Sequence, residues 1–296
     1  MKLKYYNLII EKYRELKKRD CLAELSNYFS NVPFETLQSI IYQERQRKTR
    51  KTYHLHSATD QVAAYYERYL KESQNSYGKC GFLLKMADEV DLCPALMAKL
   101  ILNYHYKKKS TEEENDEKEN IVRMKISSMM KDSSTIADPG LAAEIRLCVL
   151  ADEVYGSISD VIRTTVGFEY EIKLKEELTH LGISFIDEKQ LREKGYDKTP
   201  DIKLDTPIVI DGHIINWVES KASFGDEDRH KEYLRDQYWC YCNRFGPGLV
   251  IYWFGYIEEL NCNKEQGILI SDILPTAITF MNPSILNRQI EDLRLL

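Results

Sequence analysis

The chain lacks three features that would assign it to a broad class of proteins. It has no apolar stretch long enough to cross a bilayer and no signal peptide, so we expect an intracellular protein without a membrane anchor. Its net charge of −6 argues against a uniformly basic coat for nucleic acid, so any DNA contact must come from local basic patches. Its seven cysteines show no paired framework, which is typical of a reducing compartment.

The 296 residues are enough for two domains, and the sequence changes character near its middle. Up to about residue 151, apolar residues recur at spacings of three and four, which predicts helices. Beyond that point, helical patterns alternate with short apolar runs typical of strands. We therefore expect an α+β protein with a helical domain at 1–151 and a mixed sheet flanked by helices at 152–296. The charged stretch 107–120 is expected to be a disordered insertion.

The helical half contains two pairs of short helices that resemble helix-turn-helix units, at 22–47 and 82–106. A basic run follows the first pair, and a basic run at the end of a recognition helix suits phosphate contact. A solvated helix end is the alternative for this run, and nuclear import is a further use of it. Its candidate substrate-binding cations are Arg45, Arg47, Lys48, Arg50 and Lys51.

Two acids and a lysine occupy positions in the second half that favour a shared site. Alternating apolar residues predict strands on both sides of Asp211-Gly212, which is a strong signal for a two-residue hairpin turn. Because side chains alternate along a strand, Glu219 and Lys221 point to the same face. Asp201, at the start of the preceding strand, would then bring its carboxylate close to both of them.

Two carboxylates held close together need a cation or a shared proton. At about 4 Å and an effective dielectric constant near 20, they repel each other by about 4 kcal/mol. Mg²⁺ takes one or two carboxylates together with water and phosphate oxygens, and Mn²⁺ favours the same donors. We therefore predict a site for either metal at Asp201, Glu219 and the backbone carbonyl of Ser220. Lys221 would orient the attacking water and offset charge on the phosphate.

These residues stand in a wider pattern that resembles the PD-(D/E)xK nuclease superfamily. The signature of that superfamily corresponds to Pro200-Asp201 and Glu219-Ser220-Lys221. The longer surroundings resemble the codanin-interacting nuclease family, the group with a Thr-Pro-Asp motif, through segments 194–201, 219–226 and 243–253. The resemblance extends over nearly the whole chain and is strongest from residue 167 onward.

The resemblance implies a fold, a partner and a location. The fold is a restriction-endonuclease-like core, related to Holliday-junction resolvases and RecB-like nucleases, preceded by helix-turn-helix modules. The partner is codanin, and the expected compartments are the nucleus and the cytoplasm. A homodimer, as formed by junction resolvases, is left open.

Two further helices are expected to border the site. In the superfamily a glutamate from the first core helix reaches the metal, and Glu171 is our choice because it continues the apolar stripe of a helix predicted over 168–181. Glu169 is the alternative. A helix predicted over 229–244 matches the Gln-hydrophobic-x-x-Tyr pattern of the RecB-like branch, which implies that Gln237 and Tyr241 bind substrate. An aromatic-rich core helix would give the same pattern.

The predicted function is a metal-dependent nuclease that hydrolyses phosphodiester bonds in structured or single-stranded DNA in complex with codanin. Endonuclease and exonuclease action both remain open. An alternative is a weak or inactive interaction protein that keeps the nuclease fold as a scaffold for codanin. A third hypothesis is a DNA-binding regulator led by the N-terminal helices. The presence of Lys221 favours chemistry, because a scaffold has no need of it.

Overall fold

The computed structural model describes residues 1–16, 21–74, 80–109 and 116–281. The chain forms two compact units, one from residues 1–40 together with 166–296 and the other from residues 41–165. Helices α3 (Phe34–His56) and α9 (Ser157–His180) run from one unit into the other. Residue 151, the expected domain boundary, lies inside the second unit, and the division at that residue stays a prediction.

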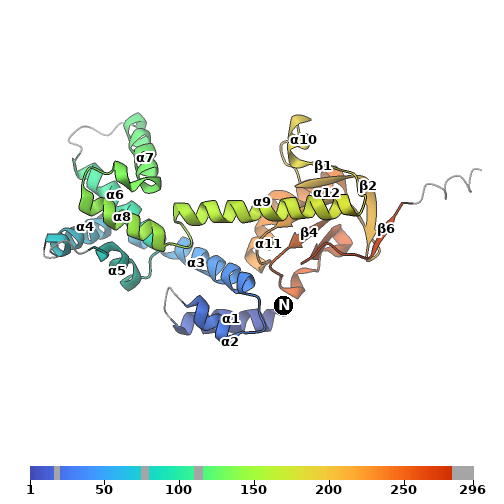
Figure 1. Cartoon of the computed structure of the whole chain (residues 1–296), viewed down its shortest axis with the longest axis horizontal. Helices are drawn as coiled ribbons and strands as arrows, with labels where there is room; N and C mark the ends of the chain where they lie inside the picture. Colours follow the sequence, from blue (N-terminus) through green and yellow to red (C-terminus); the bar gives the residue numbers. More distant parts are fainter. Residues whose placement is uncertain (17–20, 75–79, 110–115, 282–296) are drawn as a thin grey trace, which may run out of the picture. The chain divides into compact units, whose positions relative to one another are not determined.

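The described part of the first unit contains a mixed sheet of six strands (Figure 1). In chain order these are β1 (Phe185–Asp187), β2 (Ile202–Ile210), β3 (His213–Lys221), β4 (Gly248–Tyr252), β5 (Ile268–Ser271) and β6 (Ile278–Phe280). β1, β2 and β3 are antiparallel neighbours, β3, β4 and β5 are parallel neighbours, and β6 pairs with the end of β2. The expected α+β fold with a mixed sheet is confirmed.

The predicted hairpin joins β2 and β3. Asp211 and Gly212 both have positive φ, 50° and 78°, which is the backbone conformation that the favoured two-residue hairpin turns require. The pairing of Ile202 with Val218 brings the start of β2 level with the end of β3. The turn and the register therefore decide which residues meet at that end of the sheet.

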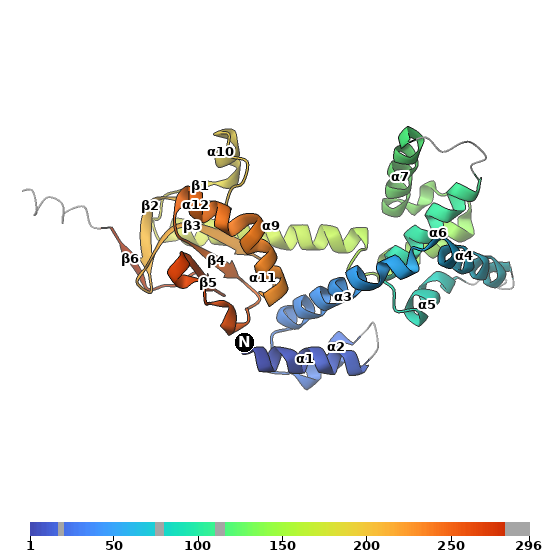
Figure 2. The same cartoon turned by 180° about the vertical axis from the view of Figure 1, so that it is seen from behind.

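The two faces of the sheet are covered by different helices (Figures 1 and 2). Leu174 and Leu178 of α9 pack with Val218 and other apolar side chains of one face. Trp217 points to the opposite face, where its ring lies 5.3 Å from that of Tyr241. This second face carries α11 (Glu227–Tyr233), a π-helical turn η2 (Leu234–Tyr238) and α12 (Trp239–Phe245). The helix predicted over 229–244 is thus interrupted by a wider turn.

The first helices of the chain pack in the same unit as the sheet. They are α1 (Leu3–Leu16), α2 (Leu22–Tyr28) and the start of α3. The ring of Tyr6 stacks on that of Phe224 at 5.8 Å, and the hydroxyl of Thr36 donates to the backbone oxygen of Phe254 at 2.8 Å. Short elements complete the unit: α10 (Glu188–Glu193), η3 (Glu258–Leu260) and η4 (Lys264–Gln266).

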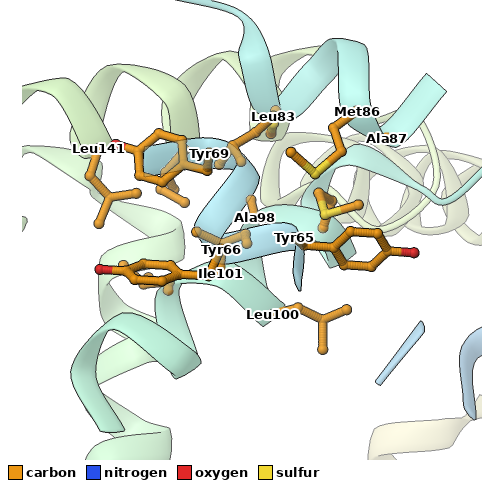
Figure 3. Packing of buried hydrophobic residues seen from close by; sticks show 14 of the residues in the cluster. Tyr65, Tyr66, Tyr69, Leu83, Met86, Ala87, Ala98, Leu100, Ile101 and Leu141 are labelled. Atoms are coloured by element: carbon orange, nitrogen blue, oxygen red, sulfur yellow. The ribbon is translucent and has the colours of Figure 1, made fainter. Parts of the chain in front are cut away.

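The second unit is a helical bundle with its own core (Figure 3). Its remaining elements are α4 (Thr59–Gln74), α5 (Phe82–Glu89), α6 (Pro94–Lys109), α7 (Asp116–Lys131), η1 (Ser133–Thr135) and α8 (Pro139–Ala151). Tyrosines of α4 pack against α5, α6 and α8 through residues such as Met86, Ile101 and Leu141. Buried Glu144 accepts hydrogen bonds from backbone N–H groups of Gly81, Phe82 and Leu83, so a remote carboxylate caps the start of α5.

Three sequence expectations about helices need correction. The basic run 44–51 lies within α3 and not at the end of a recognition helix, because α3 continues to His56. Residues 107–109 and 116–120 of the expected insertion 107–120 are helical, as parts of α6 and α7, and residues 110–115 lie outside the described residues. The helix predicted over 168–181 begins earlier, at Ser157. No described helix is long and apolar enough to span a membrane.

Candidate active site

The end of β3 brings together the two acids and the lysine singled out in the sequence. The backbone N–H of Ser220 donates to Oδ2 of Asp201 at 2.7 Å, and the backbone N–H of Asp201 donates to Oε2 of Glu219 at 3.2 Å. The Nζ of Lys221 donates to Oε1 of Glu219 at 2.6 Å. The hairpin register produces this arrangement, because it places Asp201 level with Glu219. The predicted convergence is present in the structure.

The surroundings of Asp201 and Lys221 shift the pKa of both side chains. Burial and, next, the negative charge of Glu219 raise the pKa of Asp201 well above its usual value. Burial lowers the pKa of Lys221, but the charges of Glu219 and Asp201 outweigh that effect and leave the pKa above its ordinary value. The site therefore contains a protonated lysine beside an aspartate whose ionisation is disfavoured.

Two side chains from the helical face hold Lys221 in place. Its Nζ lies 3.3 Å from Oε1 of Gln237 and 4.6 Å from the centre of the Tyr233 ring, a distance typical of a cation–π contact. Tyr233 ends α11, and Gln237 lies within the π-helical turn. π turns are frequent at functional sites. Gln237 was predicted to bind substrate, and here it contacts the lysine.

Tyr233 was missed from the sequence because nothing distinguishes it from other tyrosines on the same helix. Its spacing of four residues before Gln237 and eight before Tyr241 would have placed all three near one face of a helix. That spacing is the one signal that could have identified it.

Glu171 lies at the edge of the same site, and Glu188 is a neighbour that the sequence did not suggest. Burial raises the pKa of Glu171, and the charges of Glu188 and Glu219 add to that effect while Lys175 and Lys221 oppose it. Glu188 begins α10, and its backbone N–H donates to the backbone oxygen of Asp201 at 3.0 Å. Its carboxylate accepts from the hydroxyl of Thr199 at 3.3 Å. α10 therefore brings one more acid to the site.

Tyr241 is buried against Trp217. Burial raises its pKa, and the charges of Glu219 and Asp201 raise it further, so its hydroxyl is neutral and lies within electrostatic reach of the acids. The predicted substrate contact of Tyr241 stays a prediction.

The donor set at this site suits a hard divalent cation. Mg²⁺ needs only one or two carboxylates because water and phosphate oxygens fill its other positions, and hydrogen bonds hold the carboxyl groups of Asp201 and Glu219 at the same end of the sheet. Within the described ranges, however, no three His, Cys, Asp or Glu side chains form a group that could hold a metal ion. Glu171 thus does not complete a three-carboxylate set with Asp201 and Glu219, and its metal role stays a prediction, as does that of the Ser220 carbonyl.

The basic run of α3 lies in a different environment. Arg45 is buried and its guanidinium pairs with Glu153 at 3.0 Å. Arg47 pairs with Glu44, and Lys48 pairs with Asp91. Arg50 and Lys51 are exposed. At least three of the five candidate cations are therefore engaged within the protein.

Comparison with known proteins gives consistent results. A family model described as "Protein of unknown function TPD sequence-motif" matches residues 137–274. A Homo sapiens protein named "CDAN1-interacting nuclease 1" is 45% identical over 267 residues, covering 90% of this chain and 92% of its own. Proteins of that name from Xenopus laevis and Gallus gallus are 44% and 41% identical, covering 89% and 91% of this chain and 84% and 92% of their own. No solved structure matches the chain.

Proposed function

Because the chain belongs to the CDAN1-interacting nuclease family, we propose that it hydrolyses phosphodiester bonds in DNA with Mg²⁺ or Mn²⁺ bound beside Asp201 and Glu219. Structured or single-stranded DNA is the proposed substrate, and codanin is the proposed partner. We place this activity in the nucleus and the cytoplasm, and a homodimer is compatible with it.

The carboxylates of Asp201 and Glu219 would hold the cation, with the carbonyl of Ser220 as a further ligand. A divalent cation supplies charge stabilisation at the phosphate and lowers the pKa of water. A carboxylate must be deprotonated to act as a ligand, and burial raises the pKa of Asp201, so protons compete with the cation at this residue. This exchange of a proton for a cation makes cation binding depend on pH.

Lys221 is proposed to act as a fixed positive charge. Its pKa lies above the ordinary value, so it remains protonated at neutral pH and cannot serve as a general base. Its ammonium can donate hydrogen bonds to water or to a phosphate oxygen, where negative charge grows during the reaction. Tyr233 and Gln237 limit the positions that this ammonium can take.

Glu171 is the proposed proton acceptor. Its raised pKa brings it closer to neutral pH than that of an exposed glutamate, and it lies within electrostatic reach of Glu219 and Lys221. Gln237 and Tyr241 border the same region and are proposed to contact the substrate.

One observation carries this proposal: the end of β3 places a lysine and two acids in mutual hydrogen-bond reach through the backbone and through side chains. A core stabilised by apolar packing gains nothing from two neighbouring carboxyl groups held in one place. Their presence is explained by a ligand that they bind.

The test is cleavage of fluorescent single-stranded, flapped and four-way-junction DNA in the presence of Mg²⁺ or Mn²⁺. Wild type should cut at least one substrate, while Glu219→Ala and Lys221→Ala should not. Glu176→Ala, an exposed acid on α9, is the matched control and should cut as wild type does. Zero activity of wild type with every metal and substrate would overturn the proposal.

A second candidate function is a codanin-binding scaffold with the nuclease fold. It is favoured by the absence of a three-ligand metal group in the part of the chain that the structure describes. It is also favoured by the ion pair that Lys221 forms with Glu219. Under this hypothesis, wild type and Lys221→Ala would both bind codanin and neither would cut DNA.

A further inference from the structure

A network of three buried polar side chains lies beside the candidate active site. It consists of His230 of α11, Tyr238 of the π-helical turn and Tyr252 of β4. The hydroxyl of Tyr252 lies 3.0 Å from Nδ1 of His230 and 3.3 Å from the hydroxyl of Tyr238, so it forms a hydrogen bond with each of them. Neither tyrosine is exposed, and only 2% of His230 is exposed. We call this set the tyrosine–histidine network.

Stability alone does not explain the network. Nε2 of His230 is buried and has no hydrogen-bond partner among the residues that the structure describes, and an unsatisfied buried nitrogen destabilises a fold. Burial lowers the pKa of His230 to about 4 and raises the pKa of Tyr238 and of Tyr252 well above the ordinary value. All three side chains are therefore neutral at neutral pH. The network can fix positions, but it contributes no charge of its own.

Two links connect the network to Lys221. Tyr252 is the partner of Lys221 in the parallel register of β4 and β3, so their side chains leave the same face of the sheet as neighbours. The ring of Tyr238 lies 5.8 Å from that of Tyr233, and the centre of the Tyr233 ring lies 4.6 Å from Nζ of Lys221. The network therefore adjoins the lysine along the sheet and also supports the ring beneath it.

The hydrogen bonds of the network also attach the helical segments to the sheet. His230 lies three residues before Tyr233 on α11, and Tyr238 directly follows Gln237 in the π-helical turn. Both segments are thus bonded to Tyr252, which belongs to the strand beside β3. Tyr233 and Gln237 are the two groups of these segments that contact the ammonium of the lysine. Hydrogen bonds behind such contacting groups keep a site in its productive geometry.

We propose that His230, Tyr238 and Tyr252 are positioning residues, which fix the ring of Tyr233 and thereby the ammonium of Lys221 where it meets the phosphate of DNA. The proposal rests on the proposed function, because that function supplies the phosphate. None of the three network residues touches the substrate in this scheme, since all are buried. Their loss should therefore change the position of the lysine and the rate of cleavage, and leave the affinity for DNA unchanged.

NMR of the full chain with isotope-labelled lysine tests the position of Lys221 without DNA. Its ε-methylene protons lie near the face of the Tyr233 ring, so the ring current should shift their resonance upfield, and Lys221→Ala identifies that resonance by removing it. Tyr252→Phe breaks both hydrogen bonds of the network and should abolish at least about half of the upfield shift. The matched control is Tyr66→Phe in the second unit, which removes a buried hydrogen bond of 2.8 Å to Nδ1 of His105 and should leave the Lys221 resonance unchanged.

Rescue at His230 separates positioning from packing. His230→Asn keeps a nitrogen near the place of Nδ1 and should retain most of the upfield shift, whereas His230→Leu has no group that can bond Tyr252 and should lose as much as Tyr252→Phe does. Equal shifts in the asparagine and leucine variants would overturn the role of this hydrogen bond. Thermal midpoints show whether each variant is folded. Tyr252→Phe keeps the ring and its volume, so it remains decisive even if His230→Leu does not fold.

Cleavage kinetics supply a second readout. Tyr252→Phe should lower kcat about 3- to 5-fold with KM unchanged. The double variant Tyr252→Phe, Tyr233→Leu should be no more than about twofold slower than Tyr233→Leu, because the network acts through that ring. Losses that multiply in the double variant would overturn the proposal, as would a rise in KM with unchanged kcat.

A Lys221 resonance at its wild-type position in Tyr252→Phe would also overturn the proposal. An equal change of that resonance in Tyr66→Phe would do the same, because the effect would then follow from a general loss of stability. A wild type that cuts no DNA would overturn the proposed function, while the NMR measurement would still decide whether the network positions the lysine. The two failures are therefore recognised separately.

Discussion

Two charged clusters of this chain look equally functional in the sequence, yet the structure gives them opposite environments. At the end of β3, buried Glu219 pairs with Lys221, and partly buried Asp201 lies beside Glu219. On α3, Arg45, Arg47 and Lys48 of the run 44–51 each have an acidic partner, and Arg45 is buried. The first cluster contains two carboxyl groups and one lysine, whereas at least three cations of the second are paired with acids of the same protein.

The difference teaches that many charged residues close together in a sequence are a poor guide to function. Carboxyl groups that the fold places together away from solvent are a better guide. Burying an unpaired charge costs several kcal/mol, while an exposed ion pair contributes about 1 kcal/mol or less. A cluster that a protein maintains at such a cost is explained by what it binds.

The largest effect is expected from Lys221→Ala. Loss of the ammonium should lower the rate of DNA cleavage at least about 100-fold, because a preorganised charge at the phosphate is removed. Rates under single-turnover conditions measure this change. Lys231→Ala on α11 removes an exposed lysine that pairs with Glu227, and it should leave the rate unchanged. Equal rates for both variants would show that the charge of Lys221 does not contribute to cleavage.

The next effect concerns pH and stability without divalent metal. The pKa of Asp201 in the folded protein is above its unfolded value, so the folded state binds this proton more tightly. The resulting stability is fully present below the unfolded pKa, near the ordinary value of 3.8, and is lost as the pH rises through the folded pKa. In EDTA, Asp201→Asn should therefore raise the thermal midpoint by about 3 °C or more at pH 8 and change it little at pH 4.

Scanning fluorimetry from pH 4 to pH 8 measures this difference. Added Mg²⁺ should stabilise wild type more at pH 8 than at pH 5, and should not stabilise Asp201→Asn to the same extent. If the thermal midpoints of wild type and Asp201→Asn change with pH in parallel in EDTA, folding does not raise the pKa of Asp201.

A smaller effect is expected at Tyr233. Replacement by leucine removes the ring below the ammonium of Lys221 and should slow cleavage about 3- to 10-fold, while phenylalanine keeps the ring and should preserve the rate. KM should stay constant in both variants if the ring positions the lysine and does not touch DNA. A rise in KM with unchanged kcat would assign Tyr233 to substrate binding.

The smallest effect is expected from the basic run of α3. Lys51→Gln should weaken DNA binding no more than about threefold, because a single exposed lysine makes one phosphate contact at most. The slope of the logarithm of the binding constant against the logarithm of the salt concentration should change by less than about one. Arg45→Gln should instead lower the thermal midpoint, since it leaves Glu153 without its partner. Fluorescence anisotropy at several salt concentrations measures the affinity of Lys51→Gln for DNA. A tenfold loss of affinity would show that the basic run of α3 does bind DNA.

The sequence revealed the part of the site that depends on short-range rules. The period of two along a strand and the Asp211-Gly212 turn were enough to predict that Asp201 would meet Glu219 and Lys221. The acidic partner of Arg45 could not be predicted, because Glu153 lies 108 positions away along the chain. The approach of Glu188 to the site likewise depends on the packing of α10.

The π-helical turn was also beyond prediction. A pattern of apolar residues over 229–244 is compatible with a regular helix, and one widened turn does not change it enough to be noticed. The contact of Gln237 with Lys221 depends on that turn. The sequence therefore identified Gln237 as a site residue but did not predict that it contacts Lys221.

The wide turn at Leu234–Tyr238 makes the length of this segment as important as its composition. A regular helix advances about 100° per residue. Removing a single amino acid here would convert the wide turn into a regular helical turn and rotate the residues of α12 about the helix axis. Trp217 would lose the aromatic ring of Tyr241 against which it rests, while Lys221 would lose its amide neighbour. Homologous chains should therefore tolerate exchanged side chains in this segment far better than a change of one in their number.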